Sequence, residues 1–194
     1  PEEWAKALRA MAAMEAEVLV PSHGMPIYGN GRVRQALGEA AELLETLVEQ
    51  TLALMNRGAR LDEIIHSVKA PEELLARPYL QPLYDEPEFI VRNIWRMYGG
   101  WWDANPATVK PAPDREVAAE VARLAGGPAV LAARARELAA EGNFRLACHL
   151  AEFAWLAAPD DAAVRQARAE VYLARADTER SLMSKGIYRA AAAE

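Results

Sequence analysis

The chain has 194 residues, with 22 Lys and Arg against 28 Asp and Glu, a formal net charge of −6, three His and one Cys. Its 52% hydrophobic and 26% charged residues match an ordinary folded chain, which excludes wholesale disorder. The negative charge disfavours nucleic-acid partners, one cysteine excludes an internal disulfide, and no apolar run reaches the ~20 residues of a membrane span.

Residues 1–29 predict a helix, a short strand and a loop. Apolar side chains recur at helical spacing near the start: Trp4, Leu8 and Met11. Residues 17–20 form a short apolar run closed by Pro21, which indicates the end of a buried strand. Because a lone strand leaves its backbone groups unpaired, we interpret this segment as the last α/β unit of a sheet whose other strands are missing.

From Asn30 onward the pattern is helical. A long helix is predicted up to residues 56–58, where Gly58 suits the left-handed conformation that ends many helices. The elements expected next are a short helix from Leu61 that ends before Pro71, an extended connector at 77–82, a helix at 88–101, a turn at 103–106 and a helix with Asp114 as its N-cap.

Residues 135–159 have the spacings of one tetratricopeptide (TPR) repeat, a helical hairpin unit of about 34 residues. The matching positions are Ala135, Leu138, Gly142, Phe144, Ala147, Ala154 and Pro159. Gly142 suits the tight turn between the helices, and residues 162–174 predict a capping helix. Because a free-standing solenoid usually needs at least three repeats, we expect a TPR-like hairpin inside a larger helical domain.

His23 is the most pointed candidate for chemistry, since it lies in the loop of residues 20–29 directly after the predicted strand. Loops that follow strands in α/β layers are common ligand sites, and a neutral imidazole can bind a metal ion. A histidine that hydrogen-bonds within a turn has the same local pattern, and one histidine cannot hold a metal by itself. Spacing alone leaves both interpretations open.

The other motifs point less clearly to chemistry. His66, Cys148 and His149 have no partner at a useful helical spacing, so we interpret them as structural or surface residues. Residues 91–106 gather three of the five tryptophans, together with Tyr98 and two arginines. Such side chains form packed aromatic clusters and also dominate binding hot spots, so a core and an interface are both open.

Taken in order, these segments resemble the alkylsulfatase branch of the metallo-β-lactamase superfamily. The stretches that carry the resemblance are Pro21-Ser22-His23-Gly24-Met25-Pro26-Ile27-Tyr28-Gly29, Leu54-Met55-Asn56-Arg57-Gly58, Leu75-Ala76-Arg77-Pro78-Tyr79-Leu80 and Gly100-Trp101-Trp102-Asp103-Ala104-Asn105-Pro106. Trp102 and Ala104 depart from the Phe and Gly of the family pattern. Several motifs in the same order are more specific than any one of them.

The resemblance implies a mostly α fold in two parts. Residues 1–29 are expected to be the C-terminal remnant of a metallo-β-lactamase αββα catalytic domain. Residues 30–194 are expected to be the all-helical alkyl sulfatase dimerisation domain, which contains the TPR-like hairpin.

The resemblance also implies chemistry, in a parent enzyme with a binuclear zinc (Zn) site that hydrolyses sulfate esters with metal-activated water. The zinc-binding Thr-His-x-His-x-Asp-His loop of the family does not occur in this sequence. His23 is therefore the one metal ligand that carries over, no catalytic residue is assigned, and the chain alone is expected to be inactive. Tyr98 lies in a stretch that approaches the substrate entrance in the family, and it carries over as a substrate-binding residue.

The expected partners are a second copy in a homodimer, the N-terminal catalytic domain of the parent and a small sulfate-ester substrate. Two alternatives stay open. One is a metallo-β-lactamase-fold hydrolase that acts on another ester or a thioester, because one fold hosts many chemistries. The other is a TPR-like protein-interaction module without catalysis, which a single clear repeat unit disfavours.

Overall fold

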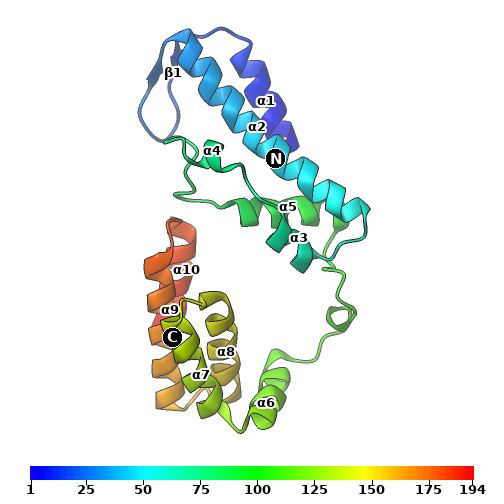
Figure 1. Ribbon diagram of the computed structural model, residues 1–194, viewed down its shortest axis with the longest axis vertical. Coiled ribbons are helices and arrows are strands. Elements are labelled where there is room, and N and C mark those ends of the chain that lie inside the picture. Colours follow the sequence, from blue (N-terminus) through cyan, green and yellow to red (C-terminus); the bar gives the residue numbers. More distant parts are fainter. The chain divides into compact units, whose positions relative to one another are not determined.

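The computed structural model describes residues 1–194 and divides them into two compact units, residues 1–109 and 110–194. Ten α-helices and one two-stranded sheet form the chain (Figure 1), which confirms the prediction of a mostly α fold. None of these helices combines the length and apolar character that crossing a bilayer requires. The domain boundary expected between residues 29 and 30 lies within the first unit and stays a prediction.

The first unit begins with a helix, a small hairpin and a long helix. These elements are α1 (Glu2–Ala12), β1 (Val18–Leu19), β2 (Ile27–Tyr28) and α2 (Asn30–Asn56). The predicted strand pairs antiparallel with β2, which the sequence pattern did not indicate because two apolar residues between prolines and glycines form no recognisable run. The buried strand end expected at residues 17–20 is wrong within this chain, since Val20 is 72% exposed.

Helix α1 packs along α2, and in Figure 1 the two helices lie side by side. The residues of α1 that face α2 are Ala5 and Leu8, which are 1% and 7% exposed. Trp4, expected on the same apolar face, is instead 62% exposed. The apolar stripe of α1 therefore extends beyond the part that α2 covers, and its Trp4 side is open.

The end of α2 confirms the prediction at Gly58. This glycine has a φ of +78°, and its N–H donates to the carbonyl of Met55 at 2.9 Å. The N–H of Ala59 donates to the carbonyl of Leu54 at 3.1 Å. The two bonds form a Schellman motif, which satisfies carbonyls at the helix end and turns the chain toward the next helix.

The remaining elements of the first unit are α3 (Leu61–Ser67), α4 (Glu72–Leu75), α5 (Pro87–Gly99) and a 3₁₀ turn at Pro106–Thr108. α4 was not expected. The extended connector at 77–82 is also wrong, because the N–H of Leu80 donates to the carbonyl of Arg77 at 3.0 Å and closes a turn. The core lies where α2 meets α3 and α5, and its most deeply buried large side chains are Leu47, Ile64 and Ile94.

The second unit is a sequence of five helices: α6 (Asp114–Ala125), α7 (Pro128–Ala140), α8 (Phe144–Ala157), α9 (Ala162–Thr178) and α10 (Leu182–Ala193). The expected N-cap is wrong by one position, since Asp114 is the first residue of α6 and its side chain makes no cap bond. Asp161 does cap α9, where its Oδ1 accepts from the N–H of Ala163 at 2.8 Å.

Helices α7 and α8 form the predicted hairpin. Gly142 turns the chain with a φ of +79°, and small side chains allow the two helices to approach closely: Ala135, Ala147, Ala151 and Ala154, each at most 1% exposed. α9 packs on both helices and α6 packs mainly on α8. The hairpin is thus present, while its kinship to tetratricopeptide repeats stays a prediction.

The core of the first unit gives a stability prediction. Ile64→Ala should lower the free energy of unfolding by about 2–5 kcal/mol, because Ile64 is 0% exposed and its removal leaves a cavity. Leu83→Ala is the matched control, since Leu83 is 54% exposed and should change stability by less than about 0.5 kcal/mol. Urea unfolding followed by tryptophan fluorescence measures both, and equal effects would contradict the assigned core.

Candidate functional site

His23 lies exposed in the loop that joins β1 and β2. Its ring has no hydrogen-bond or ion-pair partner in the chain, so no contact supports the alternative of a histidine that stabilises its own turn. The imidazole is therefore open to a group from outside the chain.

The chain by itself offers no complete metal site. No three His, Cys, Asp or Glu side chains gather in a way that could hold a metal ion. The nearest histidine in sequence, His66, has its Nδ1 2.7 Å from the carbonyl oxygen of Asp62 on its own helix. Because a zinc ion takes about four ligands, His23 alone does not fit a zinc site.

Tyr98 lies near the end of α5, and its hydroxyl donates to Glu2 Oε2 at 2.6 Å. Glu2 also pairs with Lys6 Nζ at 2.9 Å. The hydrogen bond from Tyr98 is the main cause that lowers the pKa of Glu2, and it raises the pKa of Tyr98 in turn. Tyr98 thus meets the first turn of α1, whereas His23 lies on the loop between β1 and β2, and no contact joins the two predicted site residues.

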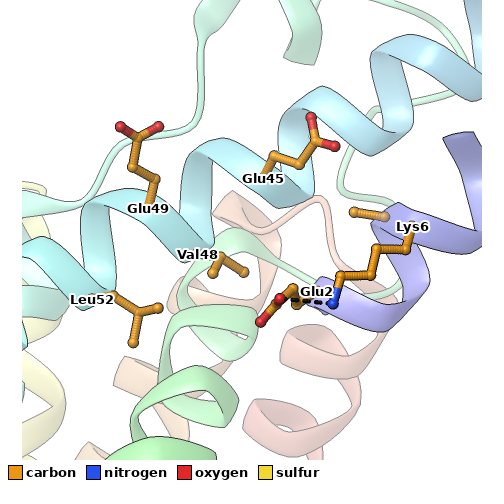
Figure 2. A pocket seen from close by; sticks show the side chains of 7 residues that line it. Glu2, Lys6, Glu45, Val48, Glu49 and Leu52 are labelled. Carbon is orange, nitrogen blue, oxygen red and sulfur yellow. Dashed lines mark ion pairs between the residues drawn. The ribbon is translucent and has the colours of Figure 1, made fainter.

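A pocket of about 410 Å³ lies beside Glu2, between α1 and α2 (Figure 2). Its walls are Glu2, Ala5, Lys6, Glu45, Val48, Glu49 and Leu52. Of its charged side chains, Glu2 pairs with Lys6 Nζ at 2.9 Å and Glu45 Oε2 accepts from Arg9 Nη2 at 2.6 Å, while the carboxylates of Glu45 and Glu49 point away from Lys6 (Figure 2). The one ammonium group of the lining is already engaged by Glu2 and the charge of Glu49 is unbalanced, so the pocket offers no free cation to an anionic sulfate ester.

The tryptophans of residues 91–106 belong partly to the core and partly to the exposed surface, the two possibilities that the sequence left open. Trp95 is buried at 8% exposure, and its indole N–H donates to the carbonyl of Trp102 at 3.0 Å. The indole N–H of Trp102 donates to the carbonyl of Asn105 at 2.8 Å. Trp101, by contrast, is 77% exposed. Trp95 therefore belongs to the core, and Trp101 is open to a partner.

Sequence reasoning missed Arg168, the one charged side chain that is buried as a whole residue, at 5% exposure. Its Nε donates to Glu152 Oε2 at 3.0 Å, and its guanidinium lies 4.1 Å from the ring centre of Trp155. Tyr172 donates to the same Glu152 oxygen at 2.8 Å, and burial raises the pKa of Tyr172. The only sequence signal for its burial was that Arg168 has the helical spacing of the apolar residues Val164 and Val171.

Cys148 carries a free, partly buried thiol. Burial raises its pKa to about 11, so the sulfur stays protonated at neutral pH. This agrees with the prediction that Cys148 and His149, as neighbours on one helix, do not form a catalytic pair.

Comparison with known proteins identifies the family. The pattern of the family described as alkyl sulfatase dimerisation matches residues 60–194, which is more than half of the chain. The chain belongs to the alkyl sulfatase dimerisation family. This finding confirms the resemblance to alkylsulfatases that the sequence motifs indicated.

Two curated relatives are named alkylsulfatases. A linear primary-alkylsulfatase of a Pseudomonas sp. strain is 30% identical over 173 residues, which cover 89% of this chain and 33% of the relative. The alkyl/aryl-sulfatase BDS1 of Saccharomyces cerevisiae is 27% identical over 187 residues, which cover 92% of this chain and 29% of the relative. The chain spans about a third of the length of these relatives.

A solved structure has the same fold. The stereoselective inverting sec-alkylsulfatase Pisa1 from Pseudomonas sp. matches with a TM-score of 0.91 and 26% identity, over 98% of this chain and 31% of that chain. A double mutant of PisA1 matches with a TM-score of 0.92 and covers 100% of this chain. The likeness therefore includes α1, the hairpin with His23 and α2, which precede the residues matched by the dimerisation family.

The contact between Tyr98 and Glu2 gives a testable pH dependence. Tyr98→Phe should raise the pKa of Glu2 toward its ordinary value, since the lost hydrogen bond is the main cause of the depression. Because the pKa of Glu2 is lower in the folded chain, the ionised Glu2 stabilises the fold at pH values above the ordinary Glu pKa of about 4.3. This contribution to the free energy of unfolding is lost as the pH falls through the depressed pKa.

Carbon-detected NMR of the Glu2 carboxyl measures this shift. Tyr28→Phe is the control, because Tyr28 is 59% exposed and lies on the hairpin, away from Glu2. An unchanged Glu2 titration in the Tyr98→Phe variant would show that the hydrogen bond does not form in solution.

Proposed function

We propose that this chain is the self-association region of a hydrolase that cleaves sulfate esters. The observation that carries the proposal is the match of residues 60–194 to the alkyl sulfatase dimerisation family. The relatives named as linear primary-alkylsulfatase and sec-alkylsulfatase support sulfate esters as the substrate class. The activity belongs to a longer enzyme, since the chain covers about a third of each relative.

In this proposal His23 supplies one ligand of a zinc site in the whole enzyme, and the other ligands come from outside these 194 residues. Support comes from the exposure of His23 and from the absence of an internal partner for its ring. Zinc binds neutral imidazole nitrogen readily, and a loop on a strand hairpin can present that nitrogen to a neighbouring domain.

The open face of α1 supports a neighbouring catalytic domain. Ala5 and Leu8 already pack on α2, yet Trp4, Met11 and Met14 are 62%, 37% and 73% exposed along α1 and just beyond its end. An apolar stripe that is only partly covered by one neighbour is typical of a helix that packs against a second layer as well. We propose that the second layer is the catalytic domain that completes the site of His23.

Tyr98 takes a limited part in this proposal. Its hydroxyl is engaged by Glu2, so the ring edge is what it can present to the apolar part of a substrate. The hydroxyl bond would hold the ring in place, which makes Glu2 a positioning residue for Tyr98.

Self-association is tested on the chain itself. Sedimentation equilibrium should find a species of twice 21.3 kDa at concentrations of roughly 10–100 μM, where interfaces of standard size are occupied. A single species of 21.3 kDa across this range would contradict the proposal.

The metal role of His23 is tested on the whole enzyme. His23→Ala should lower the zinc content and the release of sulfate from an alkyl sulfate, whereas His66→Ala should leave both unchanged, since the ring of His66 is tied to its own helix. Elemental analysis measures the metal. Full zinc content in the His23→Ala enzyme would show that His23 is not a zinc ligand. If the whole enzyme cleaves a carboxylic ester or a thioester in preference to an alkyl sulfate, the alternative of a hydrolase with another substrate is favoured.

A further inference from the structure

Helix α10 has its polar and apolar faces in the reverse of the usual arrangement. On the side packed against α9 lie Ser184, which is 6% exposed, and the half-buried Tyr188. On the opposite side lie its largest aliphatic residues, with Leu182 at 63% exposure and Ile187 at 59%. A helix of a soluble unit normally turns its apolar stripe inward, so the reversal indicates that the outward side is covered by something else.

The inner side is held by directed contacts at several points along the helix. The ring of Tyr188 stacks on that of Tyr172 with 5.8 Å between centroids and a 19° interplanar angle. The guanidinium of Arg168 donates to the carbonyl of Ala191, near the end of α10. Ser181 caps the other end, where its Oγ accepts from the N–H of Ser184 at 3.2 Å. The apolar side is therefore fixed outward at both ends.

The outward side is a continuous apolar strip that we name the α10 outer face. Its residues, spaced along one side of the helix and all exposed, are Leu182, Met183, Gly186, Ile187, Ala190 and Ala193. Arg189 borders the strip, and its guanidinium is drawn toward Asp177 of α9 at 3.9 Å. A Cβ added at Gly186 would meet nothing within 4 Å, so a second backbone can approach closely there.

We propose that the α10 outer face is the seam on which a second copy of this chain docks, with the two α10 helices antiparallel about a two-fold axis near Gly186. The proposal rests on the proposed function, which requires self-association. It deepens that function by naming the surface. The match to the dimerisation family includes all of α10, which supports a second copy as the occupant.

The order of side chains along the strip suits an antiparallel pair. Large residues lie in the N-terminal half of the helix and small residues in the C-terminal half. With the axis beside Gly186, Met183 of one copy faces Ala190 of the other, and Ile187 faces Gly186. Met183 and Ile187 then each meet a small residue, and each contact occurs twice, which is the self-complementarity that a two-fold interface needs.

Charge also permits two second units to meet. Residues 110–194 contain twelve Lys and Arg and twelve Asp and Glu, so the net charge of −6 resides in residues 1–109. Two copies of the second unit therefore carry no net repulsion. The exposed sides of α7 and α9 are less suited to docking, because their charges already pair, as in Arg136 with Glu170 at 2.7 Å.

The test compares two exposed aliphatic residues of the second unit. Ile187→Asp should raise the dimer dissociation constant about 100-fold, because each dimer would bury two unpaired carboxylates. Leu124→Asp is the matched control, since Leu124 is 73% exposed on α6 and should change the constant less than about threefold. Sedimentation equilibrium measures both, and circular dichroism verifies that the helices are retained.

The outcomes separate the two proposals. A wild-type chain that stays monomeric overturns self-association itself. A wild-type dimer that persists in Ile187→Asp overturns only the assigned seam. The same conclusion holds if Leu124→Asp, and not Ile187→Asp, is the variant that loses the dimer. In the whole enzyme, an intact Ile187→Asp dimer with a lowered unfolding temperature would assign the α10 outer face to a contact within one subunit, and would also overturn the inference.

Cross-linking tests the antiparallel geometry independently of affinity. In a Cys148→Ala background, Ile187→Cys should be joined between two copies by a short bis-maleimide, because position 187 lies beside the proposed axis. Leu124→Cys should not be joined. Ala193→Cys should not be joined either, because the antiparallel pair separates the two copies of position 193 by about 20 Å along the helices, whereas a parallel pair would place them side by side. A dimer in which Ile187→Cys resists cross-linking overturns the proposed register.

Discussion

The first unit depends on the long helix α2, which buries one stretch of its surface against α1 and the next against α3 and α5. Leu37 and Ala41 belong to the cluster with α1, and Leu47 to the cluster with Ile64 and Ile94. Because both clusters share one rigid helix, α2 sets the distance between the loop of His23 at one end of α1 and the contacts of α5 at the other. Apolar burial on a single rigid element therefore positions groups that are far apart in the chain.

In the second unit the corresponding constraint is polar. Arg168 is buried with its charge balanced by Glu152 and by Glu194 at 3.1 Å, and its flat face lies on Trp155. A buried guanidinium needs such partners in fixed directions, so it tolerates few arrangements of the helices around it. This specificity decides which side of α10 faces inward, and hence which side is left apolar and exposed.

The functional conclusion combines a family with an incomplete site. The family is established by the match of residues 60–194, whereas the proposed metal chemistry has one candidate ligand in the chain, His23, a single imidazole on an exposed hairpin loop. The open part of the apolar stripe of α1 and the α10 outer face have the same physical meaning, since each is apolar surface that water does not favour. One suits a neighbouring domain of the same enzyme, and the other suits a second copy.

Local sequence signals determined the longer helices, the left-handed Gly58, the turn at Gly142 and the family. They missed β2 and α4 and misplaced the cap at Asp114, because short segments carry little periodicity. The hydrogen bond from Tyr98 to Glu2 joins residues 96 positions apart, and the burial of Arg168 requires three helices to converge. Such contacts depend on how the helices pack and rotate. Tertiary structure alone could decide them, because helical periodicity describes one helix and not its neighbours.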